Sequence, residues 1–209
     1  MKRLKAYIED RLWDRRLHID TTGRDSTTED GHRYAYEPTP YCVLEKLIQS
    51  DWLTQDNTLL DYGCGKGRVG LFASLRTGCS SIGVDFNERF IAAAGRNLAA
   101  MESFLPAAGE PGSVSFVRSY AEVFEVPDDV DRCYFFNPFS VQLLQPVIGR
   151  ILESYYRAPR RILLMFYYPS NSYLGCLMSV EELTFVDELD CSDLFPGDDR
   201  ERIICYEIN

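Results

Sequence analysis

Three glycines at alternate positions mark the stretch of the sequence best suited to hold a ligand. Gly63, Gly65 and Gly67 lie in LLDYGCGKGRVG, residues 59–70, after an apolar run and before a helical pattern. Glycine permits positive φ angles and places no Cβ between the backbone and a neighbouring group. We therefore expect a ligand to lie against this turn.

Three classes of ligand use glycine turns, and the spacing distinguishes between them. A dinucleotide fingerprint has the form GxGxxG, but Arg68 takes the place of its third glycine and would crowd a pyrophosphate. A phosphate-cradling loop needs a hydroxyl residue after its lysine, whereas Gly67 follows Lys66. S-adenosylmethionine has no phosphate and needs an acidic residue before the turn to face its ammonium group. Asp61 is that residue, which favours the third ligand.

A second acidic residue supports the same ligand. Asp85 ends the next predicted strand, 18 residues after Gly67, where a carboxylate can accept hydrogen bonds from both hydroxyls of a ribose. A lone Asp at a strand end can instead cap the following helix. Asn87 is available for that role, so we assign Asp85 to the ribose.

Alternating strands and helices position these residues. Apolar runs predict strands at 57–63, 80–86, 113–119, 131–138, 160–169, about 182–190 and 201–208. Thr39, followed by Pro40, is expected to cap the first helix of this series. Strands separated by helices give parallel βαβ units, and the last two strands, with no helix between them, are expected to pair antiparallel at one edge.

The N-terminal segment is predicted to be separate from this pattern. Leu4, Ile8 and Leu12 are spaced by four, which predicts an amphipathic helix over residues 1–17, and the polar residues 20–33 predict a loop. We divide the chain into residues 1–37, a helix and loop, and 38–209, the main domain. The helix is expected to pack on the domain; the alternatives are a lid or a homodimer contact.

Two short motifs carry a resemblance to a known family. DYGCGKGR (61–68) and GVDF (83–86) resemble motif I and the ribose-binding acidic motif of class I S-adenosylmethionine-dependent methyltransferases. The resemblance covers about residues 38–209. It implies a Rossmann-like methyltransferase fold, which is a doubly wound α/β sheet of seven mostly parallel strands with the last strand antiparallel. It also implies S-adenosyl-L-methionine as the cofactor.

The resemblance extends to further positions around the cofactor. YEPTPY (36–41) resembles the Thr-Pro segment that covers the methionine end of the cofactor. Many members carry an acidic residue near the adenine after the third strand, where this chain has Ser119 and Tyr120. The expected cofactor-binding residues are Thr39, Asp61, Gly63, Gly65, Gly67, Asp85, Phe86, Ser119 and Tyr120.

The candidate catalytic residues follow the fourth strand, in FFNPFS (135–140). The side-chain oxygen of Asn137 and the carbonyl of Pro138 can accept both N–H hydrogens of a conjugated amine, which aims its lone pair at the methyl group. Phe139 can stack on a planar substrate. NPF is similar to the [DN]PP[FY] motif of methyltransferases acting on exocyclic adenine amines and glutamine amides, but it lacks the second proline.

The composition narrows the class of acceptor. The net charge is −10, and residues 1–20 carry six basic and four acidic side chains, so the remainder is −12. Such a surface disfavours duplex DNA. We expect an N-methyltransferase acting on a protein side chain or a small-molecule amine or amide. The alternatives are a non-catalytic S-adenosylmethionine-binding sensor or assembly protein, or a methyltransferase acting on RNA or on an oxygen acceptor.

The remaining composition predicts a cytoplasmic protein without a metal. The seven cysteines are scattered and form no CxxC, which argues against a zinc site or a disulfide framework and favours small buried side chains. No apolar run reaches the ~18 residues that span a bilayer, and the basic N-terminus lacks the apolar core of a signal peptide.

Overall fold

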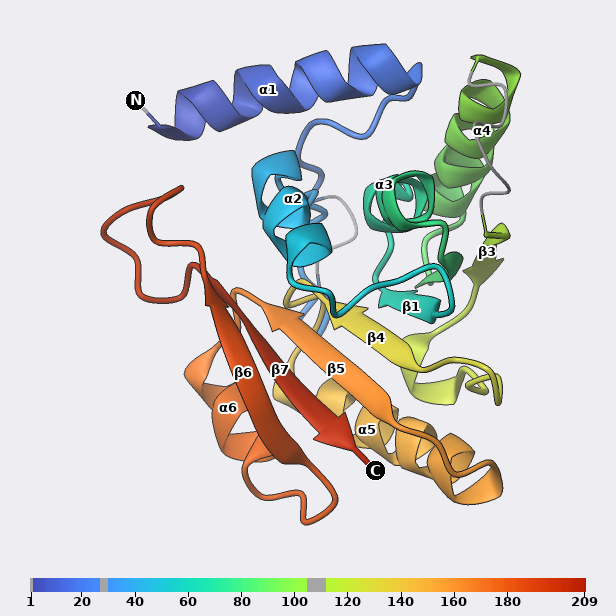
Figure 1. Ribbon diagram of the computed structural model, residues 1–209, viewed down its shortest axis with the longest axis vertical. Helices are drawn as coiled ribbons and strands as arrows, with labels where there is room; N and C mark the ends of the chain where they lie inside the picture. Colours follow the sequence, from blue (N-terminus) through green and yellow to red (C-terminus); the bar gives the residue numbers. More distant parts are fainter. Residues whose placement is uncertain (1, 27–29, 105–111) are drawn as a thin grey trace.

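A seven-stranded sheet lies between two layers of helices in the computed structural model, which describes residues 2–26, 30–104 and 112–209 (Figure 1). The strand order is β3-β2-β1-β4-β5-β7-β6. Neighbours from β3 to β5 pair in parallel, whereas β7 is antiparallel to both β5 and β6. The predicted fold class is confirmed, including the antiparallel last strand.

The element bounds agree closely with the predicted pattern. The strands are β1 (Thr58–Tyr62), β2 (Ser80–Asp85), β3 (Val114–Arg118), β4 (Arg132–Phe135), β5 (Ile162–Tyr167), β6 (Thr184–Asp190) and β7 (Arg202–Ile208). The helices are α1 (Lys2–Leu17), α2 (Tyr41–Gln49), α3 (Arg68–Thr77), α4 (Glu88–Phe104), α5 (Val141–Arg157) and α6 (Asn171–Leu177), with a 3₁₀ turn η1 (Ala121–Val123).

Two hydrophobic clusters cover the two faces of the sheet. One lies under α1 to α4 and the other under α5 and α6, which is visible as the two helical layers of Figure 1. The central strands β1 and β5 are buried along nearly their whole length, as a sheet covered on both faces requires. Both β1 and β4 therefore end in the interior, at the point where the strand order reverses.

The helix start predicted at Thr39 was wrong by one residue. Helix α2 begins at Tyr41, and Pro40 occupies the cap position. No side chain at the cap position bonds to the first turn of this helix. The carboxylate of Asp10 in α1 accepts the backbone N–H of Tyr41 at 2.9 Å instead. A side chain from a distant helix thus satisfies a donor that a local cap usually satisfies.

Helix α6 was not predicted. It has only seven residues, so its apolar pattern is too short to be separated from the strand before it. Ser170 caps it by accepting the N–H of Tyr173 at 3.2 Å.

Helix α1 packs on the domain, but through the face opposite to the predicted one. The apolar stripe Leu4, Ile8 and Leu12 keeps 63%, 51% and 48% of its surface exposed, whereas Asp10 and Asp14 are buried. The homodimer contact through this helix stays a prediction. Residues 1 and 27–29 of the predicted N-terminal segment lie outside the described residues.

Two further findings concern the chain as a whole. None of the helices in the described part combines the length and apolar character needed to cross a bilayer. Every cysteine is a free thiol and all except Cys42 are buried, which confirms that most of them are small core side chains.

Candidate functional site

The glycine turn between β1 and α3 requires glycine at all three positions. Gly63, Gly65 and Gly67 have φ angles of +75°, +52° and +87°, in the left-handed region that other residues adopt at a cost. The turn is fixed to the neighbouring strand, because the N–H groups of Gly63 and Cys64 both donate to the carbonyl of Val84.

Side chains of the protein itself lie against these glycines in the structure. A Cβ on Gly63 would lie 2.6 Å from Cβ of Pro138, and a Cβ on Gly67 would lie 2.5 Å from Cζ of Phe116. A Cβ on Gly65 would overlap the ring of Tyr36. The glycines therefore let the chain close over its own turn.

Replacing Gly65 by alanine is expected to lower the free energy of unfolding by about 2–4 kcal/mol, from the left-handed backbone and the clash with Tyr36. Gly95→Ala in α4 is the matched control, because nothing lies within 4 Å of its Cβ and the helix gains about 0.5–1 kcal/mol. Urea denaturation measures both. Similar small changes in the two variants would show that Tyr36 does not press on the turn.

Two buried carboxylates face the candidate ligand cavity. Asp61 is the last residue but one of β1, with 3% of its surface exposed, and its Oδ2 has no hydrogen-bond partner among the described residues. Burial, with a smaller contribution from Asp85, raises the pKa of Asp61 to about 8. No cation among the described residues contributes to the pKa of this carboxylate. An ammonium group bound beside Asp61 would supply the positive charge that favours its ionised form.

Asp85 is less free than the sequence suggested. Asn87 does cap α4, since its side-chain oxygen accepts the N–H of Arg89 at 3.0 Å, as predicted. However, the Asp85 carboxylate also accepts the N–H of Asn87 at 2.8 Å and that of Gly65 at 3.0 Å. It ties the glycine turn to the second strand, and each oxygen keeps a further lone pair for a ligand.

The first cavity gathers most of the predicted cofactor residues. Its walls come from the ends of β1, β2 and β4 and from residues 33–39, and its free volume is about 80 Å³. The predicted residues in its lining are Thr39, Asp61, Gly63, Asp85, Phe86, Ser119, Pro138 and Phe139. Gly65, Gly67, Tyr120 and Asn137 are outside this lining.

Residues 32–38, which we call the strap, contribute residues 33–38 to the wall of this cavity. The N–H of Tyr34 donates to the carbonyl of Pro138 at 3.2 Å, and the N–H of Ser140 donates to the carbonyl of His32 at 2.7 Å. The strap therefore pairs with the loop that holds the candidate catalytic residues. The sequence predicted part of it as an ordinary loop, because polar residues without periodicity give no signal of a distant partner.

An aromatic pair lies next to this cavity, with Phe86 in its lining and Tyr120 outside it. Phe86 and Tyr120 are nearly parallel, with ring centroids 6.0 Å apart. The guanidinium of Arg33, from the strap, lies over both rings and pairs with Glu122 at 2.6 Å. The other oxygen of Glu122 is buried without a partner among the described residues.

Neither Arg33 nor Glu122 was among the predicted site residues. Glu122 had a usable signal, because it is an acidic residue shortly after the third strand. Arg33 had none, since it lies in the polar segment before the domain. Ser119 was predicted, and its hydroxyl donates to the carbonyl of Tyr120 at 3.1 Å.

The NPF residues separate in the structure. Asn137 has a φ of +42°, and its side-chain oxygen is buried without a partner among the described residues. The Pro138 carbonyl, predicted to accept from the substrate, already accepts from Tyr34. Phe139 is 4% exposed, meets Phe135 edge-on and contributes to the lining of the first cavity. The roles predicted for Pro138 and Phe139 stay predictions.

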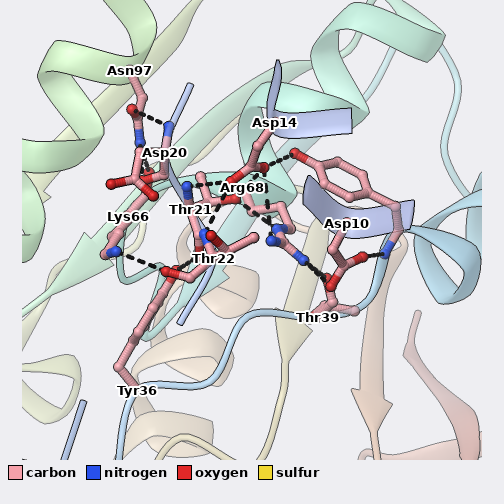
Figure 2. A network of polar contacts seen from close by, with 11 residues as sticks. Asp10, Asp14, Asp20, Thr21, Thr22, Tyr36, Thr39, Lys66, Arg68 and Asn97 are labelled. Atoms are coloured by element: carbon pink, nitrogen blue, oxygen red, sulfur yellow. Dashed lines mark hydrogen bonds and ion pairs between the residues drawn. The ribbon is translucent and has the colours of Figure 1, made fainter. Parts of the chain in front are cut away.

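Arg68 has a structural role that the sequence did not predict. Its side chain lies under α1, where it pairs with Asp10 at 2.8 Å, and Arg68 is also in the lining of the first cavity (Figure 2). It also donates to the hydroxyl of Thr21 at 2.7 Å and to the carbonyl of Thr39 at 3.0 Å. Thr39 in turn shares a hydrogen bond with the hydroxyl of Tyr134 at 3.0 Å. Arg68 thus fastens the N-terminal helix to the start of α3.

Comparisons with known proteins bear on the fold. No protein-family model matches the sequence, and no curated protein matches it. Solved structures with the same fold include the human methyltransferase 10 domain containing protein, with a TM-score of 0.60 and 12% identity over 100% of this chain and 98% of that one. A TehB-like SAM-dependent methyltransferase from Corynebacterium glutamicum has a TM-score of 0.55 and 17% identity over 99% of this chain and 98% of that one.

A third similar structure is the magnesium protoporphyrin IX methyltransferase of Synechocystis with bound SAM, with a TM-score of 0.52 and 14% identity over 80% of this chain and 75% of that one. The chain therefore has the fold of the class I S-adenosylmethionine-dependent methyltransferases, which confirms the predicted resemblance at the level of the fold.

Proposed function

We propose that the protein is an S-adenosylmethionine-dependent N-methyltransferase. The observation that carries the proposal is the partnerless oxygen of Asp61, buried beside the glycine turn and Asp85 at the reversal point of the sheet. This arrangement fits an ammonium group on Asp61 and a ribose on Asp85. Phe86, Tyr120 and Glu122 would hold the adenine. S-adenosylmethionine would supply a methyl group on a positively charged sulfur.

The strap must shift for this ligand to enter. Pockets that hold small molecules typically measure about 300–1,000 Å³, whereas the first cavity has about 80 Å³. The strap contributes Tyr36 over the glycine turn and Arg33 over the aromatic pair. Their outward movement would open the cavity and also release the carbonyl of Pro138.

The affinity for the cofactor is expected to rise with pH between 6 and 8. In the free protein Asp61 has a pKa of about 8 and is protonated below it. An ammonium ligand binds the ionised form, so binding lowers this pKa and releases a proton. Calorimetry across this pH range, in two buffers of different ionisation enthalpy, measures affinity and proton release. Asp61→Asn should remove both effects, and a flat profile in the parent protein would contradict the assignment.

The acceptor is proposed to be a protein side chain or a small-molecule amine, since the acidic surface disfavours a nucleic acid. One observation favours a second candidate function, a cofactor-binding sensor without catalysis: the strap occupies the Pro138 carbonyl that an enzyme would use. Incubation with radiolabelled S-adenosylmethionine and cell extract distinguishes the two. Labelled product supports the enzyme, whereas cofactor binding without any transfer supports the sensor.

A further inference from the structure

A second cavity of about 650 Å³ lies on the other side of the strap. It shares with the first cavity the strap residues Tyr34, Ala35, Glu37 and Pro38, together with Phe136. Asn137, whose buried side-chain oxygen has no partner among the described residues, is in its lining. The two cavities are therefore neighbours with one wall in common, which is the arrangement needed for a methyl donor and an acceptor.

Aromatic rings from separate parts of the chain make up much of this second cavity. Helix α1, the strap, the ends of β4 and β5 and the loop before β7 each contribute. The rings are Tyr7, Tyr34, Phe136, Tyr167, Tyr168 and Phe195. Ring faces attract cations through their negative electrostatic potential, with more effect where water is excluded. One ring already does so, since the guanidinium of Arg200 lies 4.0 Å from the centre of the Tyr168 ring.

The charged residues of the lining are mostly acidic. Asp10, Glu37 and Glu201 provide three carboxylates, against the single guanidinium of Arg24. Asp10 is paired with Arg68, and Glu201 accepts a hydrogen bond from the hydroxyl of Tyr167 at 2.7 Å. Glu37 is exposed and has no partner among the described residues, so its charge is available to a ligand. Rings and carboxylates together suit a cation.

The hydrogen-bond acceptors near Asn137 distinguish between two kinds of amine. A conjugated amine needs two fixed acceptors, one for each N–H, to turn its lone pair toward a methyl group. Of the two acceptors of the motif, Asn137 lines the second cavity and its side-chain oxygen has no partner among the described residues, whereas Pro138 lines the first cavity. An aliphatic amine has its lone pair localised already and needs no second acceptor.

We propose that the second cavity binds the methyl acceptor and that this acceptor is an aliphatic amine, which enters as its ammonium ion and is held by ring faces and carboxylates. The ammonium ion then loses one proton to the Glu37 carboxylate, which lines both cavities. The freed nitrogen lone pair forms the N–CH3 bond as the S–CH3 bond of S-adenosylmethionine breaks, which leaves S-adenosylhomocysteine. The assignment as acceptor rests on the proposed function, whereas the amine site itself does not. A lysine side chain and a free diamine share this chemistry, and a volume of about 650 Å³ accommodates either.

The test is a calorimetric titration of the full chain with three probes, without cofactor. 1,5-Diaminopentane is expected to bind at least tenfold more tightly than 1,5-pentanediol, which has the same length without charge, and than adenine, a planar conjugated amine. Glu37→Gln should weaken the diamine at least threefold. Glu181→Gln, an exposed carboxylate outside the cavity, should leave it unchanged. Equal binding of diol and diamine, tighter binding of adenine, or equal effects of the two variants would overturn the proposal.

Two further titrations are needed. The first distinguishes a protein acceptor from a small-molecule acceptor, and the second separates the amine site from the proposed function. A pentapeptide with one central lysine that binds more tightly than the diamine identifies a protein acceptor, and the reverse order identifies a small molecule; either result supports an aliphatic amine. S-adenosylhomocysteine is titrated separately. If it binds and the diamine does not, the amine site is wrong and the proposed function stands. If the diamine binds and S-adenosylhomocysteine does not, the amine site stands and the proposed function fails.

Discussion

Replacing Arg68 by methionine is expected to lower the free energy of unfolding by about 3–5 kcal/mol. The guanidinium is 2% exposed and pairs with Asp10 at 2.8 Å and with Asp14 at 3.7 Å. Methionine keeps much of the side-chain length but leaves both buried carboxylates without their cation. Urea denaturation followed by circular dichroism measures the loss, and α1 is expected to detach first because these contacts fasten it.

The matched control is Arg118→Met. Arg118 pairs with Glu88 at 3.1 Å, but the two side chains are 60% and 75% exposed, so this pair contributes about 0–1 kcal/mol. Adding Asp10→Asn and Asp14→Asn to Arg68→Met should recover part of the loss, because it removes the uncompensated charges. Equal, small losses in Arg68→Met and Arg118→Met would contradict the role given to this cluster.

Asn137→Ala is expected to reduce turnover by about 2–4 kcal/mol, or roughly 30- to 1,000-fold, with cofactor affinity nearly unchanged. The reason is positional. Asn137 lines the second cavity, whereas Asp61 and Asp85 line the first. Steady-state kinetics with a labelled methyl donor and calorimetry with S-adenosylhomocysteine measure the two quantities separately.

The backbone of Asn137 requires a second variant. Its φ of +42° strains an alanine, so Asn137→Gly, which accepts this angle, controls for distortion of the loop. Both variants should lose turnover if the side-chain oxygen holds the acceptor. Full turnover in Asn137→Gly would show that only the backbone matters, and lost cofactor binding in both would make Asn137 a cofactor ligand.

Local signals in the sequence correctly predicted the sheet and the positions of Asp61 and Asp85 at the ends of its strands. The apolar runs of β1, β2, β4 and β5 are buried on both faces, so their composition alone indicates strands. Asp61 and Asp85 lie at the ends of the first two strands, and a parallel sheet brings such ends to one edge. Their placement followed from the order of the elements.

Contacts between distant segments were not predictable in this way. The strap pairs with residues 138–140, about a hundred positions later, through backbone groups that leave no pattern in the side chains. Helix α1 buries Asp10 and Asp14 in preference to the stripe of Leu4, Ile8 and Leu12, because Arg68 offers those carboxylates a cation. A prediction from hydrophobic periodicity assumes that the apolar face of a helix is the buried one. In α1 a buried cluster of ion pairs makes the polar face the buried one.

The most direct test of the account is a calorimetric titration of the full chain with S-adenosylmethionine, S-adenosylhomocysteine and NADH. We predict binding of the first two at one site. Asp85→Ala should reduce the binding free energy of S-adenosylmethionine by at least about 1.5–3 kcal/mol, the contribution of one charge-assisted hydrogen bond. Because Asp85 also holds the backbone of Gly65 and Asn87, a denaturation curve must show that the variant is folded. Tight binding of NADH, with no binding of S-adenosylmethionine or S-adenosylhomocysteine, would contradict the central claim.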